Sequence, residues 1–537
     1  MRRILYITSA LLFLVWAGGL HAQEISRKSY YSFERIEEMS PWLVSPNGAG
    51  LVYNKAENNL SNAGGYYKNI SGDYRNYNQA KGADNFGLQT KSYTRIKNLY
   101  FYGSFNYDYT VRKDQAWLGT TYENTNINPM LDSIPGKNIR EAYILNAKVA
   151  YKFSDLFAGG VLFRYNTATS AKKTDGRNRN DFSDLYVSPG ISFTTRFLNL
   201  GLNLNYGHIA EKAEYKYLGE VTNKYLCYME GLFMYNTSFV NVSTVMARRY
   251  EKNIFGGGAQ LELKAGNFSF FNSLNVNFCK ENDYEDTELK RRYARVENLI
   301  YDYTGILKYS GDKMDNSLQV KYVNAEDLSY NIVSNYELVP GTLNQWEFYE
   351  YGSVLRYTSV LHNLTAEYRG FVKKNDYVSK VDFTLGFGYS NLERVEKVYP
   401  AVYRQENKVL DWYADVNKNF LFGSNILKVS LRGGFSNGSG EPLTTENPLT
   451  TGMLRLNTGV LAHDYAYRVS DSYRVGAGVD YSYIINKQKG QTLNIGVDYL
   501  YRKLTKVKGG VYDLFPGFST LEKSDRSSLG IHLNYNF

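Results

Sequence analysis

Apolar and polar residues alternate one by one along most of this chain, and this period limits its possible folds more than any other feature. Leu529, Ile531 and Leu533 fall on one face of an extended segment, while His532 falls on the other. A two-residue period is that of a β-strand whose two faces meet different surroundings. The sequence therefore predicts an all-β fold with one architecture over residues 61–537. The same pattern recurs at 101–108, 381–390, 473–483 and 493–501.

The composition of the two faces predicts which one meets lipid. The polar face carries charged residues and Gly, whereas the apolar face mixes aliphatic residues with Tyr and Phe, of which the chain has 51 and 28. This mixture is typical of a lipid-facing band edged by aromatic side chains. Segments of roughly 10 to 14 residues also suit a tilted membrane strand better than a globular one. A soluble sandwich or propeller, with the apolar face as its core, is the alternative. No recurring blade motif of a propeller is found, and we expect a transmembrane antiparallel β-barrel.

The links between these segments predict the number of strands. Short links alternate with long polar ones, and short turns at one end with long loops at the other are typical of outer-membrane barrels. Counting gives roughly 16 to 20 strands, and because such barrels close with an even number we expect about 18. The alternation breaks down at 374–408, where we expect a strand to be missed or misplaced. The short links are 154–155, 198–199 and 265–267, and the long ones are 111–140, 169–181, 280–297 and 504–525.

The first sixty residues differ from the rest. Arg2 and Arg3 precede an apolar stretch, and Ala22 is a small residue suited to cleavage, so we expect a signal peptide over 1–22 and export. A signal anchor is the alternative, but the apolar stretch is too short to span a membrane comfortably. Residues 23–60 are irregular. They are expected to form either a plug-like segment inside the barrel or a periplasmic tail with little order.

Residues that could support catalysis are sparse. A general base near neutral pH is most often His, and after the signal peptide the chain offers only His208, His362, His463 and His532. His463 and Asp464 are neighbours, but in a strand their side chains would point to opposite faces. We therefore expect no catalytic residues and no enzyme.

Metal, cofactor and nucleic-acid signals are also weak. Cys227, Cys279 and the His residues show no metal-ligand spacing, so we expect no metal and no cofactor. A Cys227–Cys279 disulfide stays open, because bridging requires Cα atoms within about 7 Å. The net charge of +9 is spread along the chain, which argues against nucleic acid as a partner.

The polar face leads to a functional hypothesis. If that face lines the interior, pore width and inward charges would set selectivity, and we expect a passive or substrate-selective channel for small solutes. The segment before the barrel is too short for the globular plug of an energised receptor. The alternative is a non-conducting accessory or scaffold barrel of a nutrient or metal uptake or secretion complex; an open lumen would favour the first, a closed lumen the second. The candidate lumen-lining residues are Arg455, Arg474, Asp480, Asp498 and His532.

Four features of the chain occur together: the signal peptide, the Tyr-rich strands, the stretch 101–107 (Phe-Tyr-Gly-Ser-Phe-Asn-Tyr) and the tail Asn-Tyr-Asn-Phe that ends at Phe537. In these features the chain resembles outer-membrane β-barrel proteins of Bacteroidota. It is closest to an uncharacterised family of barrels of about this length. The resemblance implies localisation in the outer membrane, with the lipid bilayer and the barrel assembly machinery as partners and Phe537 as the assembly signal. As an implied context, it also suggests a partner from an uptake complex.

A second similarity concerns residues 45–51. Their sequence, Ser-Pro-Asn-Gly-Ala-Gly-Leu, is similar to the Asn-Pro-Ala hatch stretch of long-chain fatty acid transporters. The order of residues departs from that pattern, which leaves transport of a hydrophobic substrate as a minor alternative.

Overall fold

A computed structural model describes most of the chain. It describes residues 32–54, 59–123, 125–174, 176–218, 225–239, 246–285, 291–422, 425–448, 455–486, 490–509 and 521–537.

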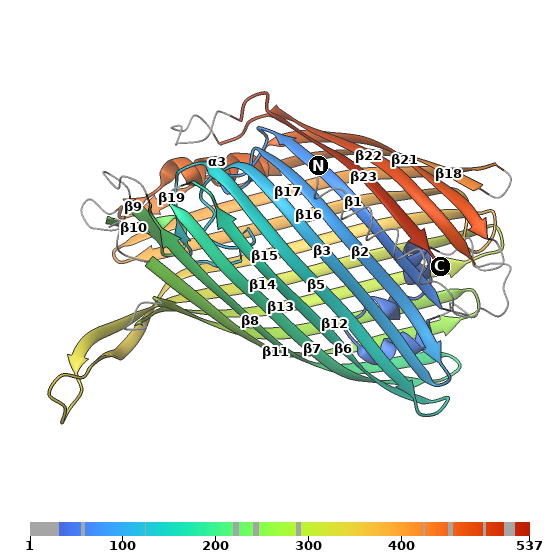
Figure 1. The fold of residues 1–537 in the computed structure, drawn as a ribbon, viewed down its shortest axis with the longest axis horizontal. Helices are drawn as coiled ribbons and strands as arrows, with labels where there is room; N and C mark the ends of the chain where they lie inside the picture. The colour runs from blue at the N-terminus through green and yellow to red at the C-terminus, as the bar shows by residue number, and fades with distance from the viewer. Residues whose placement is uncertain are drawn as a thin grey trace.

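Within these residues, eighteen long strands form one closed antiparallel barrel (Figure 1). The predicted fold class and the expected strand number are therefore confirmed. A short further strand, β19 (Thr444–Glu446), pairs with one end of β17. In order around the barrel the strands are β1 (Leu60–Gly72), β2 (Gly82–Ile96), β3 (Leu99–Gln115), β5 (Gly136–Lys152), β6 (Phe157–Lys172), β7 (Arg177–Thr194), β8 (Leu198–Lys216), β11 (Met246–Ala265), β12 (Phe268–Glu285), β13 (Arg291–Ser310), β14 (Met314–Leu338), β15 (Trp346–Lys373), β16 (Ser379–Val398), β17 (Ala401–Phe422), β18 (Asn425–Ser439), β21 (Asp471–Asn486), β22 (Gln491–Lys506) and β23 (Asp525–Asn536).

The barrel closes where its last strand pairs with its first. β23 runs antiparallel to β1, with Leu533 opposite Gly65 and Tyr535 opposite Ala63. The backbones of Ser61 and Phe537 exchange two hydrogen bonds, at 3.0 and 2.9 Å. Closure removes the exposed strand edges that would otherwise pair with other chains.

The two faces of the wall differ as the alternation predicts. On β8, Leu202 and Leu204 point outward and are 59% and 69% exposed, while Asn203 and Asn205 point inward and are buried. The Asn203 amide donates to Asn205 (2.7 Å), and Gln260 of the neighbouring strand donates to Asn203 (2.8 Å). The inner face therefore carries connected polar side chains, while the outer face is apolar.

The strands are longer than predicted. They run from 12 residues in β23 to 28 in β15. Pairing continues beyond the apolar band, where polar residues on both faces of a strand resemble a loop in sequence. Residues 280–285, expected in a loop, belong to β12 and pair with β13. Residues 198 and 199 begin β8 and are not a turn.

The region 374–408 contains all of β16 and the first residues of β17. β16 and β17 are joined by two residues, Tyr399 and Pro400, at the end of the barrel where most links are long. Such a short link leaves no loop signal in the sequence, which explains why the alternation was hard to follow there. We call this end the long-loop end, and the opposite end, with links such as 97–98 and 195–197, the short-turn end.

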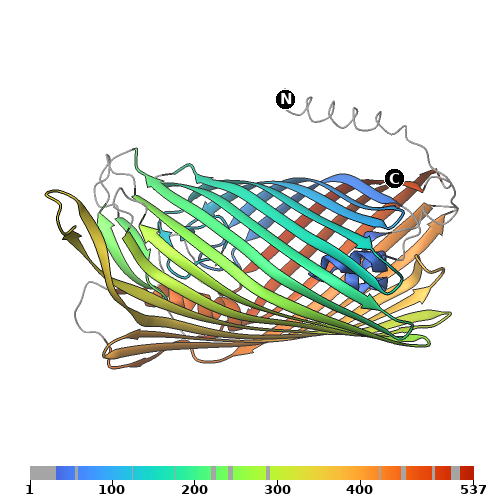
Figure 2. The same cartoon turned by 90° about the horizontal axis from the view of Figure 1, so that it is seen from below.

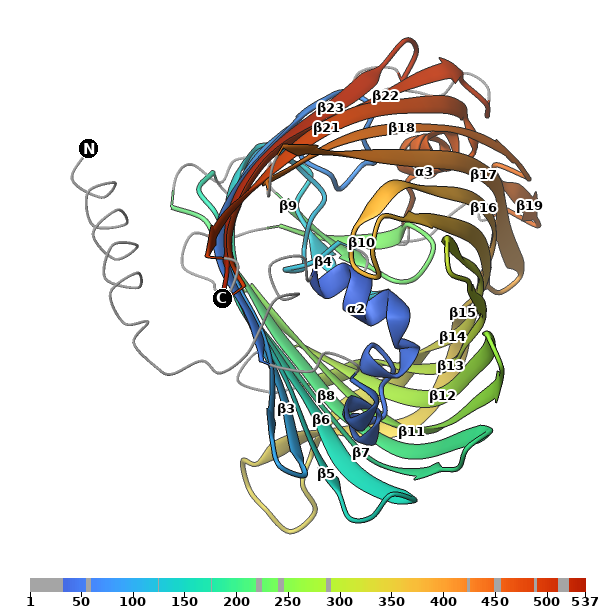
Figure 3. The same ribbon diagram turned by 90° about the vertical axis from the view of Figure 1, so that its right-hand side faces the viewer.

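Two groups of elements lie inside the barrel, one toward each end (Figures 2 and 3). At the short-turn end, residues 32–54 contain α2 (Phe33–Met39), η2 (Pro41–Leu43) and η3 (Gly48–Tyr53). We call them the plug segment. At the long-loop end, β4 (Met130–Leu131), β9 (Tyr225–Met229), β10 (Met234–Phe239) and β20 (Arg455–Leu456) form a small sheet beside α3 (Thr458–Val469). We call these elements the loop cap.

Helix α3 corrects a sequence-based interpretation. From sequence, His463 and Asp464 are expected as neighbours in a strand, but they lie in a helix. The Asn457 side chain caps its first turn by accepting a hydrogen bond from the Val460 backbone N–H (3.0 Å).

None of the helices among the described residues combines the length and apolar character needed to cross a membrane. Cys227 of β9 and Cys279 of β12 are both buried free thiols.

Candidate functional site in the barrel interior

Trp42 is a large, buried side chain of the plug segment. It is 1% exposed, and its ring contacts Tyr53 (4.7 Å between centroids) and the edge of Phe271 on the wall (5.4 Å). The indole Nε1 donates to Glu262 of β11 at 2.8 Å. Glu262 also accepts from Asn199 of β8 (2.7 Å), so it joins the plug segment to two wall strands.

Asn47 holds the next turn of the plug segment against the wall. Its Oδ1 accepts from the Ala49 backbone N–H (2.9 Å) and caps η3. Its Nδ2 lies within hydrogen-bond distance of Gln260 Oε1 (2.9 Å) and of two strand carbonyls, Ile191 (3.0 Å) and Leu202 (3.2 Å). One fully buried amide therefore connects the plug segment with three strands.

Glycines on the wall make this close approach possible. A Cβ on Gly190 would lie 2.2 Å from Asn47 Oδ1. A Cβ on Gly160 would lie 2.6 Å from the carbonyl carbon of Gly48. Larger residues at these positions would therefore push the plug segment away from the strands.

Charged side chains hold both ends of α2 and the turn after it. Arg35 pairs with Asp315 of β14, and its guanidinium lies 3.7 Å from the centroid of the Phe371 ring. Glu37 accepts from the Tyr93 hydroxyl (2.8 Å) on the opposite side. The buried Lys148 ammonium donates to the carbonyls of Leu43 and Ser45, at 2.6 and 2.7 Å, where η2 ends.

The loop cap has a hydrophobic core of its own. The turn between β9 and β10 and the start of β10 contribute Leu232, Phe233 and Met234. These side chains share a core with Trp117 of the link between β3 and β5 and with Leu461 of α3. All five side chains are buried. The core therefore joins links that lie hundreds of residues apart in the chain.

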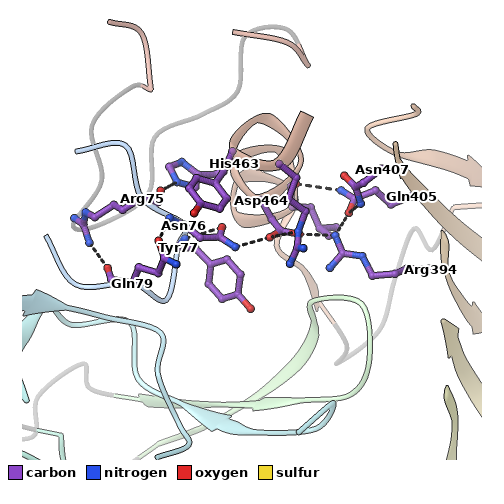
Figure 4. A network of polar contacts seen from close by, with 12 residues as sticks. Arg75, Asn76, Tyr77, Gln79, Arg394, Gln405, Asn407, His463 and Asp464 are labelled. Atoms are coloured by element: carbon purple, nitrogen blue, oxygen red, sulfur yellow. Dashed lines mark hydrogen bonds and ion pairs between the residues drawn. The ribbon is translucent and has the colours of Figure 1, made fainter. Parts of the chain in front are cut away.

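A buried polar network holds α3 to its surroundings (Figure 4). Asp464 is fully buried and pairs with Arg394 of β16. Its other oxygen accepts from Arg468 (2.9 Å) and from Asn76 of the link between β1 and β2 (2.7 Å). His463 Nε2 lies 2.9 Å from the Arg75 carbonyl.

The surroundings of this network shift the pKa values of Asp464 and His463. Burial alone would raise the pKa of Asp464, but the positive charges of Arg468 and Arg394 outweigh it and hold the pKa well below the usual range. Burial lowers the pKa of His463, and the hydrogen bond to Arg75 offsets only part of that effect. His463 and Asp464 thus bind separate partners and form no dyad.

Three of the five predicted interior residues come together. Asp480 of β21 and His532 of β23 lie 2.9 Å apart, between Oδ1 and Nε2. Asp498 of β22 faces the same side, since a Cβ on Gly530 would lie 2.4 Å from its Oδ1. The small glycines of the polar face leave room for these side chains.

The other two predicted residues lie elsewhere. Arg474 of β21 pairs with Asp411 of β17 at 2.7 Å. Arg455 lies in β20 of the loop cap, where it pairs in backbone register with Tyr235, and not in a barrel strand. That these five residues line a path for solutes stays a prediction.

Sequence reasoning missed the residues that fill the interior. Trp42, Asn47, Asp464 and Arg394 were not selected, because each matters through a partner far away in the chain. A usable signal existed for one of them: Asn47-Gly48 within the irregular stretch 45–51 is a typical helix-capping pair.

Residues 49–537 match the model of one protein family, described as a family of unknown function (DUF6850). The chain belongs to this family. The expectation of an uncharacterised barrel family is confirmed at this level, and an origin in Bacteroidota stays a prediction. No curated protein matches the chain.

Several solved structures are similar to the chain over most of its length. BauA, the ferric preacinetobactin receptor from Acinetobacter baumannii, has 11% identity and a TM-score of 0.39, over 90% of this chain and 80% of that one. The copper transporter OprC has 8% identity and a TM-score of 0.38, over 88% of this chain and 80% of that one. The RagAB peptide transporter has 7% identity and a TM-score of 0.37, over 89% of this chain and 87% of that one. At these identities and TM-scores the likeness gives no information on what this chain binds.

Proposed function

We propose that this member of the DUF6850 family is an outer-membrane barrel that passes small polar solutes, and that the plug segment closes its short-turn end. The observation that carries the proposal is the plug segment itself. It lies inside a wall with a polar inner face and is held there by separate side-chain contacts such as Trp42 to Glu262 and Asn47 to Gln260. Contacts of this kind can be broken without breaking the barrel.

The outer face supports the location in a membrane. Leu200, Leu202 and Leu204 of β8 are 41%, 59% and 69% exposed, and an exposed apolar surface of this extent is costly in water but suits lipid. Asn203 and Gln260, which face inward, would instead suit water and polar solutes. The short-turn end would then face the periplasm.

A non-conducting accessory barrel is the second candidate. It is favoured by the loop cap, whose buried core and Asp464 network resemble a folded domain more than a mobile loop. With the plug segment at the other end, such a barrel would serve as a scaffold for a partner, for example in an uptake complex.

Single-channel conductance distinguishes the two candidates. We would reconstitute the chain from Gln23 onward in planar bilayers, beside a variant that lacks residues 23–54. We expect little conductance from the first and stable conductance from the second. Silence from both, with circular dichroism showing a folded barrel, would contradict the channel and favour the scaffold.

A pair of point variants provides a matched control. The double variant Trp42→Ala with Asn47→Ala removes two plug contacts and is expected to conduct intermittently. Trp412→Ala removes a tryptophan of the outer face, 57% exposed, and is expected to stay closed. Equal behaviour of the two variants would argue against the plug contacts as the closure.

A further inference from the structure

A cavity of about 370 Å³ lies between the barrel wall and the link that joins β3 to β5. The wall contributes Asp184, Glu211, Lys252 and Glu281 from four strands, and the link contributes Tyr122 among others. A volume of this size is within the range of small-molecule sites in proteins. Neither the plug segment nor the Asp464 network takes part in it.

One carboxylate oxygen of Glu211 accepts hydrogen bonds, and the other accepts none. Glu211 is 2% exposed, and its Oε1 accepts from the Thr121 backbone N–H (2.5 Å) and from the Asn180 amide (2.9 Å). These bonds hold the link against the wall. Its Oε2 is buried and has no hydrogen-bond partner. A buried carboxylate oxygen in that state is costly unless a proton or a cation joins it.

Among the residues that line the cavity, carboxylates outnumber cations, and the Arg164 guanidinium acts on Asp184 from outside the lining. Asp184, Glu211 and Glu281 line the cavity, against one ammonium, that of Lys252. The Lys252 ammonium already pairs with Glu281 at 2.8 Å. The side of the cavity at Glu211 therefore lacks a positive charge.

Aromatic rings supply the apolar part of the lining. Tyr122 and Phe182 pack edge to face, with 5.0 Å between centroids, and Tyr250 also lines the cavity. The Arg140 guanidinium already lies 4.7 Å from the Tyr122 centroid. The rings thus offer a flat apolar wall to a ligand more than a second site for a bare charge.

We propose that this cavity binds a small organic cation, a primary ammonium attached to an aromatic or similarly flat apolar group, and that Glu211 holds the ammonium. The flat group would lie against Phe182 and Tyr250. Among the described residues no group of three or more His, Cys, Asp or Glu is arranged to hold a metal ion, which favours an organic cation. The binding of this cation is measured without conductance. The proposal therefore rests on the proposed passage of solutes only if the bound cation is itself transported.

Calorimetric titration of the purified full chain in detergent tests the proposal. The probe is phenethylammonium at about pH 8, well above the ordinary pKa of a Glu carboxyl, and 2-phenylethanol is the neutral control of similar shape. We expect phenethylammonium to bind and the alcohol to bind at least about tenfold more weakly. Glu211→Gln should weaken the binding of phenethylammonium by a similar factor.

A variant on the same strand provides the matched control. Glu214 lies on β8 and pairs with Lys212 at 2.9 Å, and it does not line the cavity. Glu214→Gln should leave binding unchanged. Should Glu211→Gln fail to fold, as read by circular dichroism, Asp184→Asn takes its place with the same expected direction.

Three results would overturn the proposal: no binding of phenethylammonium to the folded chain, equal binding of the alcohol, or equal weakening by Glu211→Gln and Glu214→Gln. A barrel that binds the probe but never conducts would instead contradict only the proposed channel.

Discussion

The plug segment and the loop cap both lie inside the barrel, but they are held in different ways. The plug segment is a single short stretch, and side chains such as Asn47 bind it to strand carbonyls and to polar residues of the wall. The loop cap collects links from across the sequence around a hydrophobic core and a buried ion pair, Asp464 with Arg394.

This difference predicts how each would leave its place. The plug segment also packs apolar side chains such as Ile36 and Leu51 against the wall, but its polar contacts use separate wall residues, so each of those can be weakened alone. The loop cap shares one core, so the loss of its central charge pair should loosen all of it. We therefore expect the plug segment to act as the movable part and the loop cap as a fixed one.

The largest effect is expected at Asp464. Asp464→Asn removes the charge but keeps the shape, and it leaves Arg394 buried without its charge partner. Breaking a buried pair in this way typically costs about 3–5 kcal/mol. Limited proteolysis of the folded barrel should then cut the loop cap first. Glu446→Gln, at an exposed position, is the control and should leave the cleavage pattern unchanged.

The next effect is expected from Gly190→Val. The new side chain would occupy the place of the Asn47 amide, so the plug segment should leave the wall and conductance should appear in planar bilayers. Gly103→Val is the control, because nothing lies within 4 Å of a Cβ there. A closed Gly190→Val barrel would mean that the wall contacts do not keep the plug segment in place.

A smaller effect is expected from Trp42→Phe. The ring is largely kept, but the hydrogen bond to Glu262 is lost, and bonds to charged groups contribute about 1.5–3 kcal/mol. Glu262 keeps its bond from Asn199, which limits the cost. We expect brief openings in conductance records, more often than in Trp412→Phe on the outer face. Records as silent as those of the unchanged chain would show that packing alone holds Trp42.

The smallest expected effect is a loss of stability of the loop cap in mild acid. Because burial lowers the pKa of His463, the unfolded loop binds a proton more readily than the folded one. Stability should therefore fall as the pH drops below the ordinary His value of about 6.5. The lowered pKa of Asp464 keeps its own contribution intact until far more acidic pH. Proteolysis at successively lower pH should show a gradual loosening of the loop cap in mild acid. His463→Gln should abolish this loosening.

The barrel could be predicted from sequence because the alternation repeats in many strands along the chain. Residues 529–537 alone indicate a strand with an apolar and a polar face. Strand ends were missed because pairing continues where both faces are polar, as in 280–285. Helix α3 was missed because its buried face carries His463 and Asp464, which read as polar residues until Arg394 and Arg75 are seen beside them.

The interior could not be predicted, because its contacts join distant residues. Asn47 meets Gln260, and Asp464 meets Asn76, with hundreds of residues between them. Residues 32–54 lie inside the barrel, and the division into a signal peptide, a plug-like or periplasmic segment over 23–60 and a barrel stays a prediction. The signal peptide over 1–22 lies outside the described residues.

The covalent link between the plug segment and the barrel also governs how the plug segment would act. Five residues separate Asn54, after η3, from Leu60, the first residue of β1. A link of that length spans at most about 20 Å when extended. A released plug segment would therefore face its binding site at an effective concentration in the millimolar range. It would behave as a tethered ligand that rebinds without diffusing away, so each opening would be brief unless another molecule took its place.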